Sequence, residues 1–255
     1  AAALACAALG DVVAVTLVTP LADRLGTPSA CAVVACDVGQ GDALLLRDPA
    51  SPGETMLVDT GDDPEALLRC LDRFGIRRIA LLVLTHDDRD HVGALPAVLD
   101  RVGAALISPG VRGEDPGARE VLRQLGRARI PHRIGVAGEG RETGAGVAWR
   151  VLAPTAGAEP ADSNAASLVI AARAGPASVL LLADTGLDEQ RALLRDAAGA
   201  AGGSLLGAHV LKVAHHGSRD QDPGLPALIG AEWALVSVGA GNRYGHPAPD
   251  TLGAL

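Results

Sequence analysis

Two histidines and three aspartates stand within six consecutive positions of the chain, 86–91. They directly follow an apolar run at 79–85 that is typical of a strand. Imidazole and carboxylate groups at one strand end can face a common point and hold two divalent cations a few ångströms apart. The alternative is an acidic helix N-cap, where aspartates complement the free backbone N–H groups and the helix dipole.

Three further apolar runs end in the same manner. Residues 55–58 lead into Asp59, residues 179–183 into Asp184, and residues 209–214 into His215 and His216. A buried strand has no reason to end on a carboxylate or a histidine pair unless those groups have partners. The joint occurrence therefore favours a metal site over four unrelated turns.

Strands and helices alternate along the chain from residue 31. Pro64 and Gly75 delimit the first helix, because proline suits a first helical position and glycine a helix end. Two half-sets of strands with helices between them predict an α/β fold, with two sheets packed face to face and helices outside, a four-layer αββα sandwich. The expected strands are 31–38, 43–47, 55–59, 79–85, 104–108, 147–153, 167–172, 179–183, 209–214 and 233–238, and the expected helices 63–75, 91–102, 116–128, 187–198 and 223–229.

Composition narrows the function classes. A chain of 255 residues with 48% hydrophobic and 20% charged residues is globular rather than disordered. Aromatic residues make up only 2%, so base-stacking platforms are not a large feature and nucleic acid would be held by its phosphates. The net charge of −8 has the wrong sign for nonspecific coating of DNA. Two bound dications would reduce it to −4 where a phosphate must lie.

The four cysteines show no metal-binding spacing and are interpreted mainly as small core residues. Cys31 and Cys36 would point to opposite faces of one strand, which disfavours a bridge between them. The cysteines leave the redox compartment open.

Residues 1–22 are mostly apolar, with Asp11 in the middle and no basic start, which is unlike a signal peptide. A central aspartate costs a membrane helix roughly 2.5–3.5 kcal/mol. The segment is interpreted as the trailing end of a membrane segment, followed by a linker to residue 30. An Ala-rich helix packed on the domain is the equally weighted alternative.

Seven ordered motifs resemble the C-terminal hydrolase domain of the ComEC family of competence DNA-uptake proteins, which has the metallo-β-lactamase fold. They cover about residues 31–255 and lie at 37–43 (DVGQGDA), 57–61 (LVDTG), 85–91 (THDDRDH), 162–168 (DSNAASL), 182–184 (LAD), 212–218 (KVAHHGS) and 242–247 (NRYGHP). The resemblance implies an extracytoplasmic nuclease domain on a membrane channel, degrading one strand of incoming DNA. Its implied partners are DNA, the membrane portion of the same polypeptide and other competence proteins.

Two features depart from the family pattern. Ala183 stands where family members often have glycine, a change that we expect to be tolerated if the residue is extended. The chain also stops at Leu255, earlier than the family fold, so we expect a truncated C-terminus.

The resemblance assigns two metal sites that share Asp184. The first would use His86, Asp88, Asp184 and, as a further oxygen ligand, Asn164; the second would use Asp90, His91, Asp184 and His216. Asp88 replaces the usual histidine, which shifts the preference from Zn²⁺ toward Mn²⁺ or Mg²⁺. Asp59, with Asp37 or Asp42, would fix the ligands by hydrogen bonds.

Such a pair of cations lowers the pKa of a shared water, and a bridging hydroxide would attack phosphorus in line. His215 is interpreted as a phosphate contact or hydrogen-bond donor, with a mere spacer as the alternative. His246 would protonate the leaving oxygen or bind a nonbridging one, unless it is an ordinary turn residue. The further phosphate or substrate contacts expected on the motif loops are Lys212, Ser218, Arg219, Asn242, Arg243 and Tyr244.

The reaction expected is therefore metal-dependent phosphodiester hydrolysis of DNA. One alternative is a phosphodiesterase for a small or cell-surface substrate such as phosphorylcholine, which the low aromatic content disfavours because choline recognition needs an aromatic cage. The other is a noncatalytic, metal-stabilised domain of a DNA transport channel.

Overall fold

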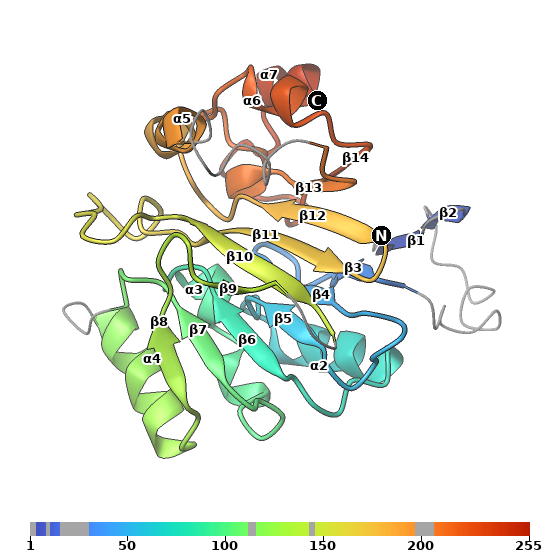
Figure 1. Ribbon diagram of the computed structural model, residues 1–255, viewed down its shortest axis with the longest axis vertical. Helices are drawn as coiled ribbons and strands as arrows, with labels where there is room; N and C mark the ends of the chain where they lie inside the picture. Colours follow the sequence, from blue (N-terminus) through green and yellow to red (C-terminus); the bar gives the residue numbers. More distant parts are fainter. Residues whose placement is uncertain (1–3, 9–10, 16–30, 112–115, 143–145, 197–206) are drawn as a thin grey trace.

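The computed structural model describes residues 4–8, 11–15, 31–111, 116–142, 146–196 and 207–255. Two sheets pack face to face, and helices cover their outer faces (Figure 1). This arrangement confirms the predicted four-layer sandwich.

The first sheet has eight strands in the order β2-β1-β3-β4-β5-β6-β7-β8. Helices α2 (Pro64–Arg73), α3 (Arg89–Val92) and α4 (Pro116–Arg127) belong to this half, with the 3₁₀ turn η1 (Leu95–Ala97) after α3. The strands are β1 (Leu4–Ala8), β2 (Asp11–Val15), β3 (Val33–Ala35), β4 (Leu44–Leu46), β5 (Met56–Val58), β6 (Leu81–Leu84), β7 (Ala105–Ile107) and β8 (His132–Ile134).

The second sheet has six strands in the order β14-β13-β12-β11-β10-β9. Helices α5 (Leu187–Asp196), α6 (Leu225–Ile229) and α7 (Pro249–Ala254) lie on its outer side (Figure 1), and η4 (Ala214–Gly217) follows β13. The strands are β9 (Gly140–Arg141), β10 (Ala148–Ala153), β11 (Val169–Ala174), β12 (Ala177–Leu181), β13 (Val210–Lys212) and β14 (Trp233–Leu235).

Side-chain alternation along the strands builds three apolar layers. In β4, Leu44 and Leu46 pack between the two sheets, while Leu45 packs against the helices of the first half. In the second sheet, Leu181 of β12 faces the first sheet and Leu180 packs on the side of α5 and α6. The central strands of both sheets are therefore buried on both faces, which explains the near-continuous apolar runs in the sequence.

The carboxyl ends of two sets of parallel strands position the polar residues. Strands β5, β6 and β7 are parallel in the first sheet, and β12, β13 and β14 are parallel in the second. The carboxyl ends of parallel strands lie at one edge of a sheet. The loops that follow β5, β6, β12 and β13 carry the histidines and aspartates singled out above.

Two expected helices differ from the structure. Residues 4–8 and 11–15 form the antiparallel strands β1 and β2, with β1 paired to β3, rather than either of the expected helical segments. Valines at 12, 13 and 15 favour extended backbone, and a uniformly apolar run has no period that distinguishes the two states. The rest of 1–30 lies outside the described residues. The helix expected at 91–102 is divided into α3 and η1, since Pro96 lacks the amide hydrogen that a continuing helix needs.

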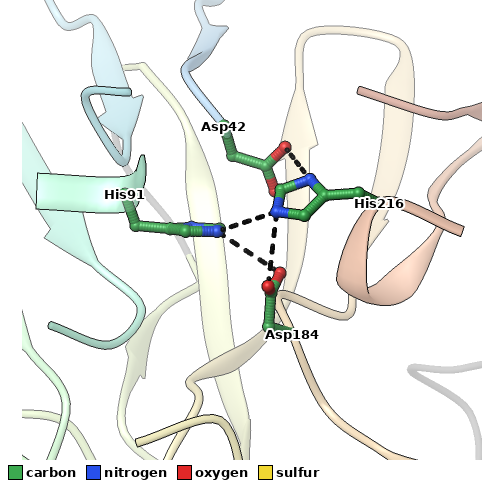
Figure 2. Close-up of side chains that lie close together, drawn as sticks. All are labelled: Asp42, His91, Asp184 and His216. Atoms are coloured by element: carbon green, nitrogen blue, oxygen red, sulfur yellow. Dashed lines mark hydrogen bonds and ion pairs between the residues drawn. The ribbon is translucent and has the colours of Figure 1, made fainter. Parts of the chain in front are cut away.

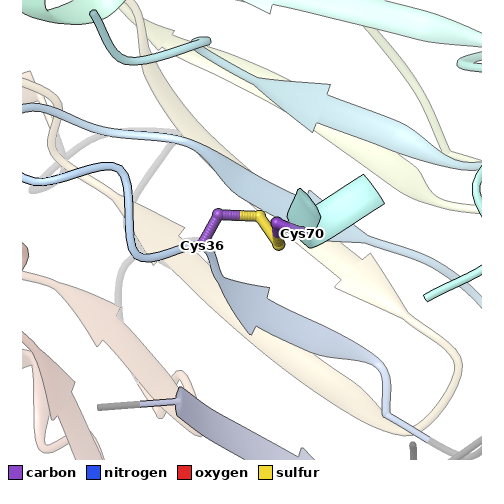
Figure 3. The surroundings of a disulfide bond; sticks show 2 residues. All are labelled: Cys36 and Cys70. Carbon is purple, nitrogen blue, oxygen red and sulfur yellow. A yellow bond between two sulfur atoms is a disulfide. The ribbon is translucent and has the colours of Figure 1, made fainter. Parts of the chain in front are cut away.

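Cys36 and Cys70 form a disulfide that joins the end of β3 to α2 (Figure 3). The interpretation of most cysteines as plain core residues is therefore wrong for this pair. The two residues are 34 positions apart, and only the packing of α2 on the sheet brings them together. Across the described ranges, no helix has the length and apolar character to span a membrane.

Candidate metal centre

His91 of α3, His216 of η4 and Asp184 after β12 converge, and Asp42 approaches from the segment before β4 (Figure 2). His91 Nε2 lies 3.4 Å from Asp184 Oδ1 and 3.3 Å from His216 Nε2. His216 Nε2 lies 3.3 Å from both Asp184 Oδ2 and Asp90 Oδ2. We call Asp90, His91, Asp184 and His216 the His216 half of the centre. Its members are the four residues expected at the second metal site.

Asp59 supports His91 from behind. Its Oδ2 accepts a hydrogen bond from the Thr85 hydroxyl at 2.7 Å and lies 2.9 Å from His91 Nδ1, and its Oδ1 accepts from the Thr85 backbone N–H at 2.8 Å. A hydrogen on Nδ1 leaves the lone pair of Nε2 pointing at Asp184. The structure places Asp59 where the sequence analysis expected a residue that fixes a ligand.

Asp42 supports His216 in a different manner. Its Oδ1 lies 3.7 Å from His216 Nδ1, the ring nitrogen that also lies 2.9 Å from the Ser237 carbonyl oxygen. Because Nε2 is the nitrogen that faces Asp184, Asp42 lies behind the ring and not beside Nε2 (Figure 2). The other oxygen of Asp42 pairs with Lys212 Nζ at 2.7 Å.

Lys212 is not a substrate contact, in contrast to the expectation. The side chain is 1% exposed, and its ammonium also donates to the Val213 carbonyl oxygen. Lys212 alternates with Leu211 on β13 and so points between the sheets, on the side of Val210. An ammonium enclosed there cannot reach a bound phosphate.

His86, Asp88 and Asn164 form, with the shared Asp184, what we call the His86 half. His86 is fully buried and its ring packs against that of His91, with centroids 4.0 Å apart. Its Nε2 lies 3.8 Å from Asp88 Oδ2. The Asp88 side chain is 47% exposed and accepts a hydrogen bond from the Ser163 hydroxyl at 2.7 Å. Asp88 stands at the N-cap position of α3 but makes no side-chain capping bond, so the N-cap alternative does not account for it.

Three buried atoms of the centre lack a hydrogen-bond partner among the described residues: His86 Nε2, Asn164 Oδ1 and Asp184 Oδ1. A buried polar atom without a partner costs free energy, about 1–3 kcal/mol each. All three atoms carry lone pairs suited to a divalent cation, and the surrounding donors are imidazole nitrogens and carboxylate oxygens. His91, Asp184 and His216 therefore fit a metal site in donor type and in placement, and His86, Asp88 and Asn164 fit one in donor type.

The charges of the two halves differ before any cation binds. Burial and the neighbouring His91 lower the pKa of His86 to about 4. Burial also opposes a charge on His216, but hydrogen bonds to Asp184 and Asp90 outweigh it and raise the pKa to about 9. Likewise, Asp184 and Asp59 raise the pKa of His91 well above its usual range despite burial. Protons thus occupy the His216 half at neutral pH, whereas His86 is neutral.

Left-handed backbone is concentrated at this centre. Asp59, Ala183, His215 and His216 have positive φ angles of 58°, 50°, 45° and 53°. Such conformations cost of order 1–3 kcal/mol for a residue with a Cβ atom and cluster at functional sites. Ala183 is not extended, so the condition set for tolerating alanine there is not met, and glycine would fit this position with less strain.

His215 and His246 lie at the open side of the centre. His215 Nε2 lies 3.8 Å from Asp184 Oδ2, and its ring makes an edge contact with His246 at 5.4 Å between centroids. The pKa of His246 is lowered by partial burial and by His215. Its Nδ1 is buried and has no hydrogen-bond partner among the described residues. Both imidazoles border the metal ligands without belonging to either half.

Asp37 and the remaining expected substrate contacts differ in whether they are exposed and in whether they lie near the centre. Asp37 is exposed, so it does not fix a ligand from a buried position. Ser218 is buried, and its hydroxyl accepts from the Asp220 backbone N–H. The side chain of Arg219 pairs with Asp250 at 3.5 Å. The remaining three, Asn242, Arg243 and Tyr244, lie together in a loop beside His246.

Sequence reasoning missed Ser163 and Thr85 as supports of Asp88 and Asp59. Each lies inside a quoted motif, directly before Asn164 and directly before His86. A serine or threonine directly before a candidate ligand was the feature of the sequence that could have indicated these supporting hydrogen bonds.

Comparison with known proteins shows the following similarities. The family model of the metallo-beta-lactamase superfamily matches residues 36–221. ComE operon protein 3 of Bacillus subtilis (strain 168) is 29% identical over an alignment of 242 residues that covers 86% of this chain and 30% of that protein. Competence protein ComA of Neisseria gonorrhoeae is 30% identical over 220 residues, 85% of this chain and 28% of that protein. The chain thus spans less than a third of the length of these curated relatives.

Two solved structures share the fold. The metallo-beta-lactamase fold protein YhfI from Bacillus subtilis superposes with a TM-score of 0.58 at 12% identity, over 87% of this chain and 92% of that one. Tm1679, a metal-dependent hydrolase of the beta-lactamase superfamily, gives 0.50 at 17% identity, over 82% of this chain and 87% of that one. At these identities the likeness concerns the fold alone.

Proposed function

The chain belongs to the metallo-beta-lactamase superfamily, and from this premise we propose that it is a metal-dependent phosphodiesterase that cleaves DNA during natural transformation. The observation that carries the proposal is the convergence of His91, His216 and Asp184, whose Oδ1 has no hydrogen-bond partner among the described residues. A carboxylate so placed is suited to bind a cation together with the two imidazoles, and we propose that Asp184 also serves a second cation beside His86, Asp88 and Asn164. The similarity to two competence proteins supports DNA as the substrate.

We assign two roles to the side chains of the centre, which are binding of the cations and orientation of the ligands. His86, Asp88, Asp90, His91, Asn164, Asp184 and His216 would hold two divalent cations, with Mn²⁺ favoured over Zn²⁺ or Mg²⁺. When bound, the cations would activate a water and neutralise charge on the phosphodiester. Asp59 orients the His91 ring and the Ser237 carbonyl oxygen orients the His216 ring, and Asp42 adds a negative charge behind His216. Oxygen donors outnumber nitrogen donors in the His86 half, which supports the preference for a harder metal than zinc.

His215 and His246 would act on the substrate. Their rings border Asp184 on its open side, where a phosphodiester approaches the centre. Because the pKa of His246 is lowered, its ring is neutral at pH 7 and is suited to donate one hydrogen bond to a nonbridging oxygen of the phosphate. Protonation of the leaving oxygen would require the imidazolium form, which the lowered pKa disfavours. Arg243 lies on the same loop and would contact a neighbouring phosphate.

We also propose that the domain works on the outer side of a membrane, as part of a longer polypeptide whose channel portion delivers the DNA. The Cys36–Cys70 disulfide supports an oxidising compartment, because such bonds are rare in the reducing cytosol. The short coverage of both curated relatives supports a longer parent.

The test is cleavage of linear and circular DNA, a nitrophenyl phosphodiester and a phosphorylcholine ester by the purified chain with Mn²⁺, Zn²⁺ or a chelator. We expect DNA hydrolysis that is faster with Mn²⁺ than with Zn²⁺ at equal occupancy and absent with the chelator. His132→Ala, which removes an exposed imidazole on β8, is the matched control and should leave the rate unchanged. Cleavage of the choline ester alone would indicate the small-substrate alternative, and metal binding without hydrolysis the noncatalytic one.

A further inference from the structure

Tyr244 is the most exposed large aromatic side chain of the described chain, at 72%, and it lies beside the candidate metal centre. It borders a cavity of about 1030 Å³ together with Asp90, which belongs to the His216 half, and His246. Of the four Phe, Trp and Tyr residues of the protein, this is the one that borders the cavity beside the candidate metal centre.

The loop around Tyr244 is held in shape by Asn242. The Asn242 side-chain oxygen accepts hydrogen bonds from the backbone N–H groups of Tyr244 and His246, at 3.1 and 3.3 Å. Its amide donates to the His246 carbonyl oxygen at 2.7 Å. The ring is therefore presented by a fixed turn, and binding would cost little additional ordering.

A series of rings connects Tyr244 to the metal ligands. The Tyr244 ring stacks on His246 with centroids 5.9 Å apart and planes inclined by 29°. His246 contacts His215, which contacts Asp184. If a phosphate binds beside His215 and His246, the group stacked on the outer face of Tyr244 would belong to the neighbouring nucleotide of the strand.

The chemistry of the cavity favours a nucleobase on this ring. Among the residues that border the cavity, Tyr244 is the one phenyl-type ring, so a cage of several rings for a quaternary ammonium is not formed. A single ring face next to a phosphate site instead matches a nucleotide, whose base stacks on aromatic side chains irrespective of sequence.

We infer that Tyr244 is the stacking platform for the nucleobase adjacent to the scissile phosphate, so that the site selects a strand whose base is unpaired at that position. The inference rests on the proposed function and names the form of DNA that it acts on. A base within a duplex is stacked between its neighbours and would have to be freed before it could reach the ring. Single-stranded DNA or a frayed end is therefore the preferred substrate.

The test combines Tyr244→Ala, Tyr244→Phe and Tyr244→Trp with single-stranded oligonucleotides that carry one abasic residue at successive positions. With Mn²⁺, we expect the abasic residue next to the cut to lower kcat/KM of the wild-type protein about 10-fold, as the loss of one stacked base predicts. Tyr244→Ala should lose a similar factor on the intact strand and nothing further on the abasic one, while the Phe and Trp variants should behave as wild type. Trp233→Ala, which removes a half-exposed ring outside the cavity, is the matched control.

Equal losses of Tyr244→Ala on intact and abasic strands would overturn the inference, as would a Phe variant as weak as the Ala variant, because the hydroxyl would then be the active group. Quenching of 2-aminopurine in a bound oligonucleotide separates this inference from the proposed function. Quenching that requires Tyr244 supports stacking even if no strand is cut, whereas cleavage by wild type without such quenching rejects stacking and leaves the nuclease proposal standing.

Discussion

The two halves of the centre share Asp184 but are held in different ways. In the His216 half, His91 is fixed by a hydrogen bond with Asp59 and His216 by one with the Ser237 carbonyl oxygen, and the Asp42 carboxylate lies 3.7 Å from the same nitrogen of His216. In the His86 half, His86 Nδ1 lies 3.1 Å from the Thr85 hydroxyl, but Asp88 is half-exposed and held by one serine hydroxyl, and Asn164 Oδ1 has no hydrogen-bond partner in the described part of the chain.

This difference indicates that one half is preorganised and the other is completed by its ion. A ligand whose orientation is already fixed loses little freedom on binding, so supporting residues raise metal affinity. We therefore expect the His216 half to bind a divalent cation first and more tightly. The His86 half, with its exposed carboxylate, should fill second and exchange faster.

Asp184→Ala should give the largest effect, because it removes the one side chain common to both halves. We expect the bound metal to fall from two ions per chain to none, and DNA hydrolysis to fall below about a thousandth of the wild-type rate, as the loss of metal activation implies. Elemental analysis of the dialysed protein and a DNA cleavage assay measure the two quantities. Retention of one tightly bound ion would show that the halves are independent and that Asp184 does not join them.

The second-largest expected difference between the two halves is in the pH dependence of their metal affinity. The folded-state pKa of His216 is about 9, raised above its ordinary value near 6.5, so the proton stabilises the chelator-treated protein fully below pH 6.5 and that stabilisation is lost as the pH rises through 9. An incoming cation must displace this proton and the one that the raised pKa of His91 keeps on the second imidazole. Its affinity for the His216 half should therefore rise by more than about 10-fold per pH unit between pH 6.5 and 9.

In the His86 half, the histidine should cause no such pH dependence of metal affinity. The pKa of His86 is lowered to about 4, so the ring is already neutral. Calorimetric titration with Mn²⁺ in buffers of different ionisation enthalpy measures the protons released at each step. Equal proton release in the two steps would contradict the assignment of the charged histidine to the first.

Asp59→Asn should weaken the His216 half by about 10- to 100-fold in metal affinity, the usual cost of losing a residue that orients a ligand. The amide would present a donor to His91 Nδ1 and so favour a hydrogen on Nε2, the nitrogen that must bind the ion. The asparagine oxygen can still accept from the Thr85 backbone N–H, which limits the loss of fold stability. Thermal unfolding with chelator serves as the control, and a fall in stability without a fall in affinity would mean that Asp59 is structural only.

The sequence was sufficient to locate individual strands and helices. It was insufficient to predict contacts between side chains that are distant in the sequence. Apolar runs, Pro64 and Gly75 located β5, α2 and β6 within a few residues. The contact of His91 with His216 joins positions 125 apart, and no local pattern determines its distance. For Lys212, alternation after Leu211 was a usable signal that its side chain points into the protein, but the burial depended on Asp42 being there to pair with it.

Ser163→Ala should give the smallest effect and is the matched counterpart of Asp59→Asn, because each variant alters one hydrogen bond to one expected ligand. Its target, Asp88, is half-exposed, so water can replace the lost hydroxyl. A net hydrogen bond at such a position is worth about 0.5–1.5 kcal/mol at most, and we expect no more than about a 3-fold loss of affinity in the second binding step. The first step should be unchanged, and the effects of the two variants should add in the double mutant, since they act on different ions. Calorimetric titration of the wild type, the two single variants and the double variant gives the metal affinities of both binding steps for the four proteins of the cycle. A loss as large as that of Asp59→Asn would show that the His86 half is as preorganised as the His216 half, and the order of filling argued from their different support would then have no structural basis.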